Sequence, residues 1–182
     1  MDLEKLLKDL RVLQEGHFVL NSGLHSQYYF EKFRILENPE AASKLCSMIA
    51  EKFQNKDIDW VIGPTTGGII IAFEVARQMK KLAGFAEVRD GKRVVGRGFN
   101  IKGKNILIVD DVMTTGKSLL ETIDAVKEKD AYIVGIAVLI DRSIKKFPSE
   151  YFATYQKVVK NYEPAVCPLC KKKVALSKPG GV

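Results

Sequence analysis

Hydrophobic and polar residues alternate along this chain in blocks that predict short buried strands separated by helices. The apolar runs "WVIGP", "NILIV" and "YIVGIAVLI" lie between segments with the apolar spacing of helices. Strands that are apolar on both faces and alternate with helices of about a dozen residues indicate a parallel sheet covered on both sides. The predicted fold class is therefore α/β, with a central, mostly parallel sheet flanked by helices.

The ends of these elements follow from their periodicity and from capping residues, proline and glycine. The expected helices cover residues 2–14, 38–52, 67–82 and 117–129. The expected strands cover residues 59–63, 84–88, 106–109 and 132–140. Residues 85–88 and 93–99 flank the turn "RDGK" and are expected to form a hairpin or a mobile flap. The tail after Asn161 is expected to be irregular.

Length and composition are those of one globular domain. The 182 residues are 46% apolar and 28% charged, as in soluble proteins that bury a core. No apolar run reaches the roughly 18 residues that cross a bilayer. Residues 1–11 alternate charge with leucine instead of forming a signal peptide. We therefore expect a cytoplasmic protein without a membrane partner.

The net charge of +7 is compatible with nucleic acid or a phosphorylated small molecule as a ligand. The lysine runs at residues 145–146 and 171–173 contain no aromatic residues, which argues against single-strand binding. The sequence contains no zinc-finger or RNA-binding sheet motif. We expect no nucleic-acid partner.

The three cysteines fit a cytoplasmic location. Cys46 lies in an apolar helical pattern and is expected in the core. Cys167 and Cys170 form the motif "CPLC", which is half of a zinc site. No second pair of Cys or His completes it, because the only histidines are His17 and His25. We therefore expect a structured tail without a metal.

Candidate chemical groups follow three of the predicted strands. They lie in residues 63–68, in residues 110–118 and at Asp141-Arg142. In an open parallel sheet, ligands bind beyond the carboxyl ends of the strands. The three segments are therefore expected to form one active site.

The sequence "TTGKS" ends like the phosphate loop of nucleoside triphosphatases. That motif requires a glycine five positions before Gly116, and Asp111 stands there. We therefore reject this function. Residues 114–118 nevertheless turn into a helix N-terminus, where free N–H groups and the helix dipole attract a phosphate. An ordinary Ser/Thr-rich helix cap is the alternative interpretation.

The adjacent carboxylates of Asp110 and Asp111 end a buried strand, which is costly unless they meet donors or a cation. Ribose supplies vicinal hydroxyl groups, and Mg²⁺ bound to a diphosphate supplies a cation. A ligand with a ribose and a 5′-phosphate would satisfy the whole segment. Because extended neighbours face opposite ways, we expect the chain to turn at these aspartates.

The segment from Ile106 to Ser118 resembles the phosphoribosyl diphosphate (PRPP) motif of type I phosphoribosyltransferases. The segment "GHFVLNSGLHSQYYFEKF" resembles the hood of the orotate phosphoribosyltransferase family, and "LIDRS" resembles the strand end that carries its orotate-binding arginine. The likeness covers residues 16–143, and "CPLC" resembles the tail of some bacterial members. It implies transfer of ribose 5-phosphate from PRPP to orotate, with release of diphosphate, in pyrimidine (UMP) synthesis.

The resemblance also implies an arrangement and partners. A single domain, residues 1–182, would consist of a hood (about 1–35 with the tail, about 155–182) and a core (about 38–150). Mg²⁺ would be carried by PRPP, with no direct protein ligand. The protein would be a homodimer with shared active sites.

The resemblance assigns roles residue by residue. For PRPP, it implies ribose contacts from Asp110 and Asp111, 5′-phosphate contacts from Thr114, Thr115, Gly116, Lys117 and Ser118, and diphosphate contacts from Thr65, Thr66, Gly67 and Arg89. For orotate, it implies contacts from Arg142, Thr114, Tyr29, Phe30 and Asn21. The chemistry of arginine supports the assignment of Arg142 independently, because a guanidinium binds a carboxylate with two parallel hydrogen bonds.

Two departures from the family pattern stand out. Asn21 replaces a lysine, and the flap "RDGKRVVGRGF" is short and lacks histidine. The catalytic cation would then come from Lys92, Arg93 or Arg97, or from Arg89.

Three alternatives remain at this point. Another type I transferase, acting on a purine or uracil, would share the PRPP motif. A regulatory protein could keep the fold and bind RNA without chemistry. Asp141 and Arg142 could also form an ordinary surface ion pair.

Overall fold

The computed structural model describes residues 2–20 and 22–179 and contains a central sheet of six strands. In spatial order these are β5 (Lys92–Val95), β4 (Leu82–Arg89), β3 (Trp60–Pro64), β6 (Asn105–Met113), β7 (Tyr132–Asp141) and β8 (Phe152–Gln156). All neighbours are parallel except β4 and β5, which form the expected antiparallel hairpin. The predicted α/β class is confirmed.

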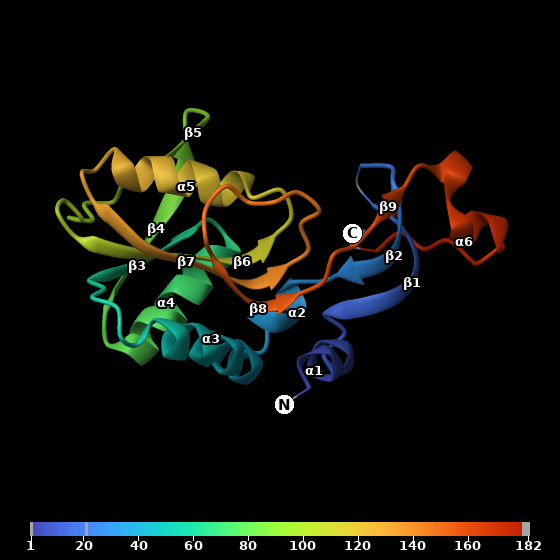
Figure 1. The fold of residues 1–182 in the computed structure, drawn as a ribbon, viewed down its shortest axis with the longest axis horizontal. Coiled ribbons are helices and arrows are strands. Elements are labelled where there is room, and N and C mark those ends of the chain that lie inside the picture. Colours follow the sequence, from blue (N-terminus) through green and yellow to red (C-terminus); the bar gives the residue numbers. More distant parts are fainter. Residues whose placement is uncertain (1, 21, 180–182) are drawn as a thin grey trace.

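Helices cover both faces of this sheet (Figure 1). Helices α3 (Pro39–Phe53) and α4 (Gly67–Met79) lie on one face, and α5 (Lys117–Lys127) lies on the other. The N-terminus of α3 is fixed as its sequence predicts, with Pro39 in the first turn and the Asn38 side chain accepting a 3.1 Å hydrogen bond from Ala41 N.

Alternate side chains of β6 enter two separate cores. Leu107 and Val109 pack with the residues of α3 and α4, whereas Ile106 and Ile108 pack with those of α5. This alternation assigns each position of β6 to one face of the sheet. It therefore also determines where the aspartates at the end of the strand point.

A second, smaller sheet forms the hood. Its strands are β1 (Leu13–Val19), β2 (His25–Phe30) and β9 (Asn161–Tyr162), all antiparallel, preceded by helix α1 (Leu3–Asp9). The short helix α2 (Phe33–Leu36) leads from β2 into the core. Figure 1 shows that the C-terminal segment returns to the hood beside β1 and β2.

The predicted helix over residues 2–14 is too long. It ends at Asp9, Arg11 has a positive φ of 56°, and Leu13 already pairs with Phe30 in the hood sheet. The leucine periodicity continues past the helix because Leu13 is buried by the strand instead. Pairing between segments distant in sequence prevails here over local pattern.

The tail is also more ordered than predicted. After β9 it forms a 3₁₀ turn, η1 (Pro164–Val166), and a short helix, α6 (Pro168–Lys171). Ser177 then lies against β1, donating its N–H to the carbonyl of His17 at 2.8 Å and accepting from Val19 N at 2.9 Å. The tail is thus held by backbone hydrogen bonds that no local sequence pattern predicts.

The expectation that "CPLC" lacks a second ligand pair is wrong. His17 of β1 and His25 of β2 meet across the hood sheet, and Cys167 and Cys170 lie against both of them. The sequence could not indicate this cluster, because the cysteines lie 142 or more positions after the histidines (167 − 25 = 142). The return of the tail to the hood brings the two pairs together.

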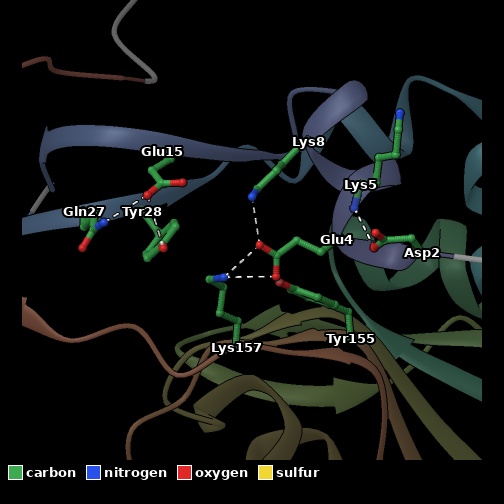
Figure 2. A network of polar contacts seen from close by, with 9 residues as sticks. All are labelled: Asp2, Glu4, Lys5, Lys8, Glu15, Gln27, Tyr28, Tyr155 and Lys157. Carbon is green, nitrogen blue, oxygen red and sulfur yellow. Dashed lines mark hydrogen bonds and ion pairs between the residues drawn. The ribbon is translucent and has the colours of Figure 1, made fainter.

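A polar network joins the hood to the core at Glu4 of α1 (Figure 2). The Glu4 carboxylate accepts hydrogen bonds from Tyr155 of β8 at 2.8 Å and from Lys157 at 3.1 and 3.2 Å, and it pairs with Lys8. Lys8, Tyr155 and Lys157 together lower the pKa of Glu4 to about 2. The Lys157 ammonium also lies 4.5 Å from the centre of the Tyr28 ring in β2. These contacts connect α1, the hood sheet and β8.

Among residues 2–20 and 22–179, none of the helices combines the length and apolar character that a membrane crossing requires.

Candidate active site

The paired aspartates lie within strand β6, and the expected turn at their position is absent. Asp110 pairs with Val138, and the register with β7 continues to Met113 opposite Asp141. The two carboxylates therefore point to opposite faces of the sheet, Asp110 toward α5 and Asp111 toward α4. The prediction of a turn was wrong because pairing with β7 keeps the strand extended until residue 114.

Asp110 is held in a nearly dry environment. Its carboxylate is 5% exposed and accepts hydrogen bonds of 2.8 Å from Ser118 Oγ and from Asp111 N. Burial, with the adjacent charge of Asp111 as a second cause, raises the pKa of Asp110 to about 7. The hydrogen bond from Ser118 also fixes the first turn of α5 against the strand end.

Replacing Asp110 with asparagine is expected to stabilise the ligand-free protein at pH 8 by on the order of 2 kcal/mol or more. In the folded protein the raised pKa keeps a proton on Asp110 up to about pH 7, whereas the unfolded chain releases it near its ordinary pKa of 3.8. At this residue the unfolded chain therefore binds fewer protons in this range, and the contribution of Asp110 to the stability of the wild type falls as the pH rises from about 4 to about 7. An asparagine does not titrate, but it can still accept from Asp111 N and donate to Ser118 Oγ.

Urea unfolding of both proteins at pH 4 and pH 8 measures this effect. The difference in unfolding free energy should be small at pH 4 and large at pH 8. An equal difference at both pH values would contradict the raised pKa of Asp110.

Asp111 faces the side of the sheet that α4 covers, and Lys32 reaches it there. The distance from Lys32 Nζ to Asp111 Oδ2 is 2.9 Å, and Oδ1 accepts a 2.6 Å hydrogen bond from Val112 N. Lys32 forms an ion pair with Oδ2, but no residue in the described part of the chain donates a hydrogen bond to this buried oxygen. Nothing in the sequence marks Lys32 except that it lies two residues after the aromatic run of Tyr28, Tyr29 and Phe30.

Gly67 at the start of α4 leaves room for Asp111. A Cβ atom at residue 67 would lie 1.8 Å from Asp111 Oδ2, a contact that no side chain could make without displacing the carboxylate. The loop of Thr65, Thr66 and Gly67 therefore packs directly against the second aspartate. Thr65 N donates to Ala86 O at 2.9 Å, and the Thr65–Thr66 peptide bond is cis.

Residues 114–118 form the predicted loop and helix start. Gly116 has a φ of 76°, a conformation that favours glycine, and Thr115 Oγ1 accepts a 3.4 Å hydrogen bond from Lys117 N, the first amide of α5. The side chain of Lys117 is 81% exposed. A pocket of about 510 Å³ opens over the loop and also includes Arg93 and Glu121. Free amides at a helix start facing an open pocket can hold a phosphate.

The candidate cations of the β4–β5 hairpin are all paired with carboxylates. Arg89 and Arg97 both bind Glu87, and Lys92 lies 2.7 Å from Glu128. The side chain of Arg93 is only 8% exposed, and it donates to Ala86 O at 3.1 Å and to Glu121 at 3.2 Å. Of these four, Arg93 is the one that lines the pocket over the phosphate loop.

Arg142 follows β7 and connects to the same loop. Its backbone N donates to Met113 O at 3.0 Å, and its Nε donates to Thr114 Oγ1 at 3.3 Å. Burial lowers the pKa of Arg142, and the field of its guanidinium reaches the Tyr29 hydroxyl, whose pKa is raised mainly by burial. A guanidinium that has lost much of its water can bind an anion strongly.

A pocket of about 330 Å³ lies beside this arginine. Its lining residues are Thr114, Thr115, Arg142, Ile144, Lys145, Val159 and Asn161. The side-chain oxygen of Asn161 is buried and has no hydrogen-bond partner within the described part of the chain. Asn161 lies in β9, at the start of the tail and outside any recognisable motif, so the sequence does not mark it as a site residue. It offers an acceptor to a ligand N–H group.

Three expectations about this region need correction or limitation. Asp141 is not in a surface ion pair with Arg142; it is 3% exposed and accepts from Tyr151 at 2.7 Å and Gln156 at 2.6 Å. The ring of Phe30 packs in the hydrophobic core, so only its backbone is available to a ligand. Asn21 lies outside the described residues.

A larger pocket, of about 940 Å³, lies elsewhere. It lies beyond the C-terminal end of α3 and includes Lys52, Lys56 and Lys146. It contains none of the residues that the sequence assigned to the site, and the groups that could perform phosphoribosyl chemistry are at the carboxyl ends of β3, β6 and β7.

Comparisons with known proteins agree with this geometry. Residues 33–169 match the family model described as phosphoribosyl transferase domain. A protein of Caldanaerobacter subterraneus named orotate phosphoribosyltransferase is 41% identical to this chain. The alignment is 186 positions long and covers 99% of this chain and 98% of the relative. One of the same name from Caldicellulosiruptor bescii is 39% identical over 97% of this chain and 94% of its own length.

Comparison with solved structures also finds orotate phosphoribosyltransferases. The crystal structure of orotate phosphoribosyltransferase from Aeropyrum pernix superposes with a TM-score of 0.72 at 27% identity, covering 85% of this chain and 93% of that chain. The chain therefore belongs to the orotate phosphoribosyltransferase family, within the phosphoribosyl transferase domains.

Proposed function

We propose that this protein is an orotate phosphoribosyltransferase, a pentosyltransferase that converts PRPP and orotate to orotidine 5′-monophosphate and diphosphate. The observation that carries the proposal is the contact between Arg142 and Thr114, which joins a half-buried guanidinium to the phosphate loop. An anionic base and a sugar phosphate could then be bound side by side. The relatives that match along nearly the whole chain bear this name.

In this proposal the protein binds PRPP along the carboxyl edge of the sheet. The free amides of α5 hold the 5′-phosphate, together with the hydroxyls of Thr114 and Thr115. Once Lys32 has moved away, the buried Oδ2 of Asp111 accepts a hydrogen bond from a ribose hydroxyl. The diphosphate extends toward residues 65–67, whose loop already touches Asp111.

Orotate is proposed to occupy the pocket beside Arg142. Its carboxylate meets the guanidinium, and Asn161 accepts from a ring N–H. Tyr29 lies within the field of Arg142 and would close the pocket from the hood. Uracil lacks the carboxylate and would leave the charge of Arg142 without a partner, which is a physical basis for discrimination.

The chemical step is a displacement at the anomeric carbon through a state with oxocarbenium character, as in glycoside transfer. The chain contributes by fixing the ribose and by excluding water, and both contributions act mainly through electrostatics. The orotate ring nitrogen attacks after it has lost its proton, so the step requires no strong general base. Lys32 and Arg93 are the cations nearest to the PRPP side, but each first has to leave a carboxylate partner.

The oxygen donors at this edge fit Mg²⁺ delivered with PRPP, because a hard cation prefers carboxylate and phosphate oxygens. The observation that supports this fit is that the buried Oδ2 of Asp111 already attracts a cation, the Lys32 ammonium, at 2.9 Å. Bound Mg²⁺ would neutralise charge on the departing diphosphate. We also propose a cytoplasmic homodimer in which the β4–β5 hairpin reaches the partner's site, since the family pattern implies shared sites.

The decisive experiment measures diphosphate release from PRPP and Mg²⁺ with orotate, uracil, hypoxanthine or adenine in separate reactions. Release should depend on orotate and remain at background with the other bases. Release with uracil or a purine alone would assign another member of the type I transferases. Absence of release with all four, together with salt-dependent RNA retention on a filter, would favour a regulatory function.

A further inference from the structure

The hood contains a cluster of metal-binding side chains that the proposed reaction does not use. His17, His25, Cys167 and Cys170 place one ligand atom each within 4.8 Å of all the others. His17 is 2% exposed, His25 is 6% exposed and Cys167 is fully buried. These two thiols and two imidazoles lie away from the active-site edge of the central sheet, so the transfer reaction does not account for their arrangement.

The distances in the cluster are those of the edges of a coordination tetrahedron. With Zn–S near 2.3 Å and Zn–N near 2.05 Å, tetrahedral geometry separates N from S by about 3.6 Å and N from N by about 3.3 Å. The Nε2 atom of His17 lies 3.5 Å from Cys167 Sγ and 3.7 Å from Cys170 Sγ. The Nδ1 atom of His25 lies 3.2 Å from Cys170 Sγ and 3.0 Å from His17 Nε2.

The other nitrogen of His17 is fixed by the tail. His17 Nδ1 lies 2.8 Å from the carbonyl oxygen of Val174, which can only accept a hydrogen bond. The Nδ1 atom therefore carries the proton, and Nε2 directs its lone pair into the cluster. A backbone carbonyl that orients a ligating histidine in this way is a common outer partner in metal sites.

Charge also favours a divalent cation at this place. Two thiolates and two neutral imidazoles carry a total charge of −2, so a bound Zn²⁺ gives a neutral site. Neutrality matters because three of the four residues are buried and an uncompensated charge there would be costly. On binding, each thiol releases its proton to solvent and each sulfur forms a bond to the metal.

We propose that His17, His25, Cys167 and Cys170 bind one structural Zn²⁺ ion. All four positions of the tetrahedron are taken by protein atoms, so the site is closed and has no position for a substrate. Its ligands come from β1, from β2 and from the segment around α6, and it joins the C-terminal tail to the hood sheet. The proposal goes beyond the transfer reaction and does not depend on which base is used.

Metal analysis of the full chain tests this proposal. The protein is stripped with a chelator under reducing conditions, incubated with Zn²⁺, passed through a desalting column and analysed for bound metal. The wild type should retain about one Zn²⁺ per chain, as expected for a closed four-ligand site. Cys170→Ser and His25→Asn should each lose most of it, whereas Cys46→Ala, which removes the cysteine outside the cluster, should match the wild type.

Cobalt provides a readout that reports on the ligands themselves. Co²⁺ added to the stripped wild type should give the visible bands of a tetrahedral ion and the near-ultraviolet band of thiolate bonding, and Zn²⁺ should abolish both. In Cys170→Ser the thiolate band should fall by about half, because one of two sulfurs remains. This comparison remains informative if the variants hold Zn²⁺ too weakly to survive desalting.

The melting temperature measures how much bound Zn²⁺ stabilises the folded protein. Zn²⁺ should raise it in the stripped wild type and in Cys46→Ala, with no rise in a Cys167→Ser/Cys170→Ser variant. The proposal is overturned if the reduced wild type retains no stoichiometric Zn²⁺ and shows no thiolate band with Co²⁺. It is equally overturned if the cluster variants bind as much metal as Cys46→Ala. An orotate assay that fails would leave the metal results unchanged, so the two proposals are tested separately.

Discussion

Replacing Arg142 with alanine is expected to raise the KM for orotate by roughly 10- to 100-fold, the equivalent of losing about 1.5–3 kcal/mol of charge-assisted hydrogen bonding. The KM for PRPP should change by less than about twofold, because Arg142 meets the phosphate loop only through its contact with Thr114 Oγ1. The reason is the proposed pairing of the guanidinium with the orotate carboxylate. Steady-state kinetics with each substrate varied in turn measures both constants.

Lys145 provides the matched control. It lines the same pocket and carries the same charge, but it is exposed, whereas Arg142 is half-buried. Lys145→Ala should leave the KM for orotate close to that of the wild type. Equal changes in both KM values of Arg142→Ala, or a larger orotate effect in Lys145→Ala, would contradict the assignment of Arg142 to the carboxylate.

The second large effect is expected at Asp111. Asp111→Asn should lower kcat by at least about tenfold, or roughly 1.4 kcal/mol of transition-state stabilisation. The amide removes the negative charge that would support the ribose as positive charge develops, and it leaves Lys32 without its carboxylate partner. Single-turnover measurements with saturating substrates separate this loss from a change in binding.

Two variants separate charge from position at this site. Lys32→Met removes the cation but keeps the carboxylate, and it should retain more activity than Asp111→Asn. Gly67→Ala keeps both charges but introduces a Cβ that would lie 1.8 Å from Asp111 Oδ2, so it should lower kcat through displacement of the carboxylate. Wild-type turnover in Asp111→Asn would remove the ribose contact from the proposal.

The parts of the fold that sequence predicts best are those with local signals. The strand over residues 106–109 and the helix starting at Lys117 are marked by uninterrupted hydrophobicity and by the Gly116 turn, and both are present. The proposed phosphate-binding loop, residues 114–118, could be located for the same reason. A buried strand and a helix start determine their own geometry within about ten residues, whatever the rest of the chain does.

The parts that escaped prediction depend on segments distant in sequence. Asp110 and Asp111 face opposite ways because β7 continues to pair with their strand, which their own residues do not indicate. Lys32 and Asn161 lie in polar segments without a motif, and they reach the proposed site only because the hood folds against the core. The four side chains of the proposed zinc site come from both ends of the chain for the same reason.

The return of the C-terminal tail to the hood has a consequence for folding during synthesis. β9 pairs Tyr162 with His25, a separation of 137 residues (162 − 25 = 137), whereas the strands of the central sheet come from one continuous stretch of chain between them. Contacts between such distant residues carry a high entropic cost and form late. The central sheet can therefore form during synthesis before β9 has emerged from the ribosome, and the proposed orotate pocket, which includes Asn161, becomes complete only after β9 has joined the hood sheet.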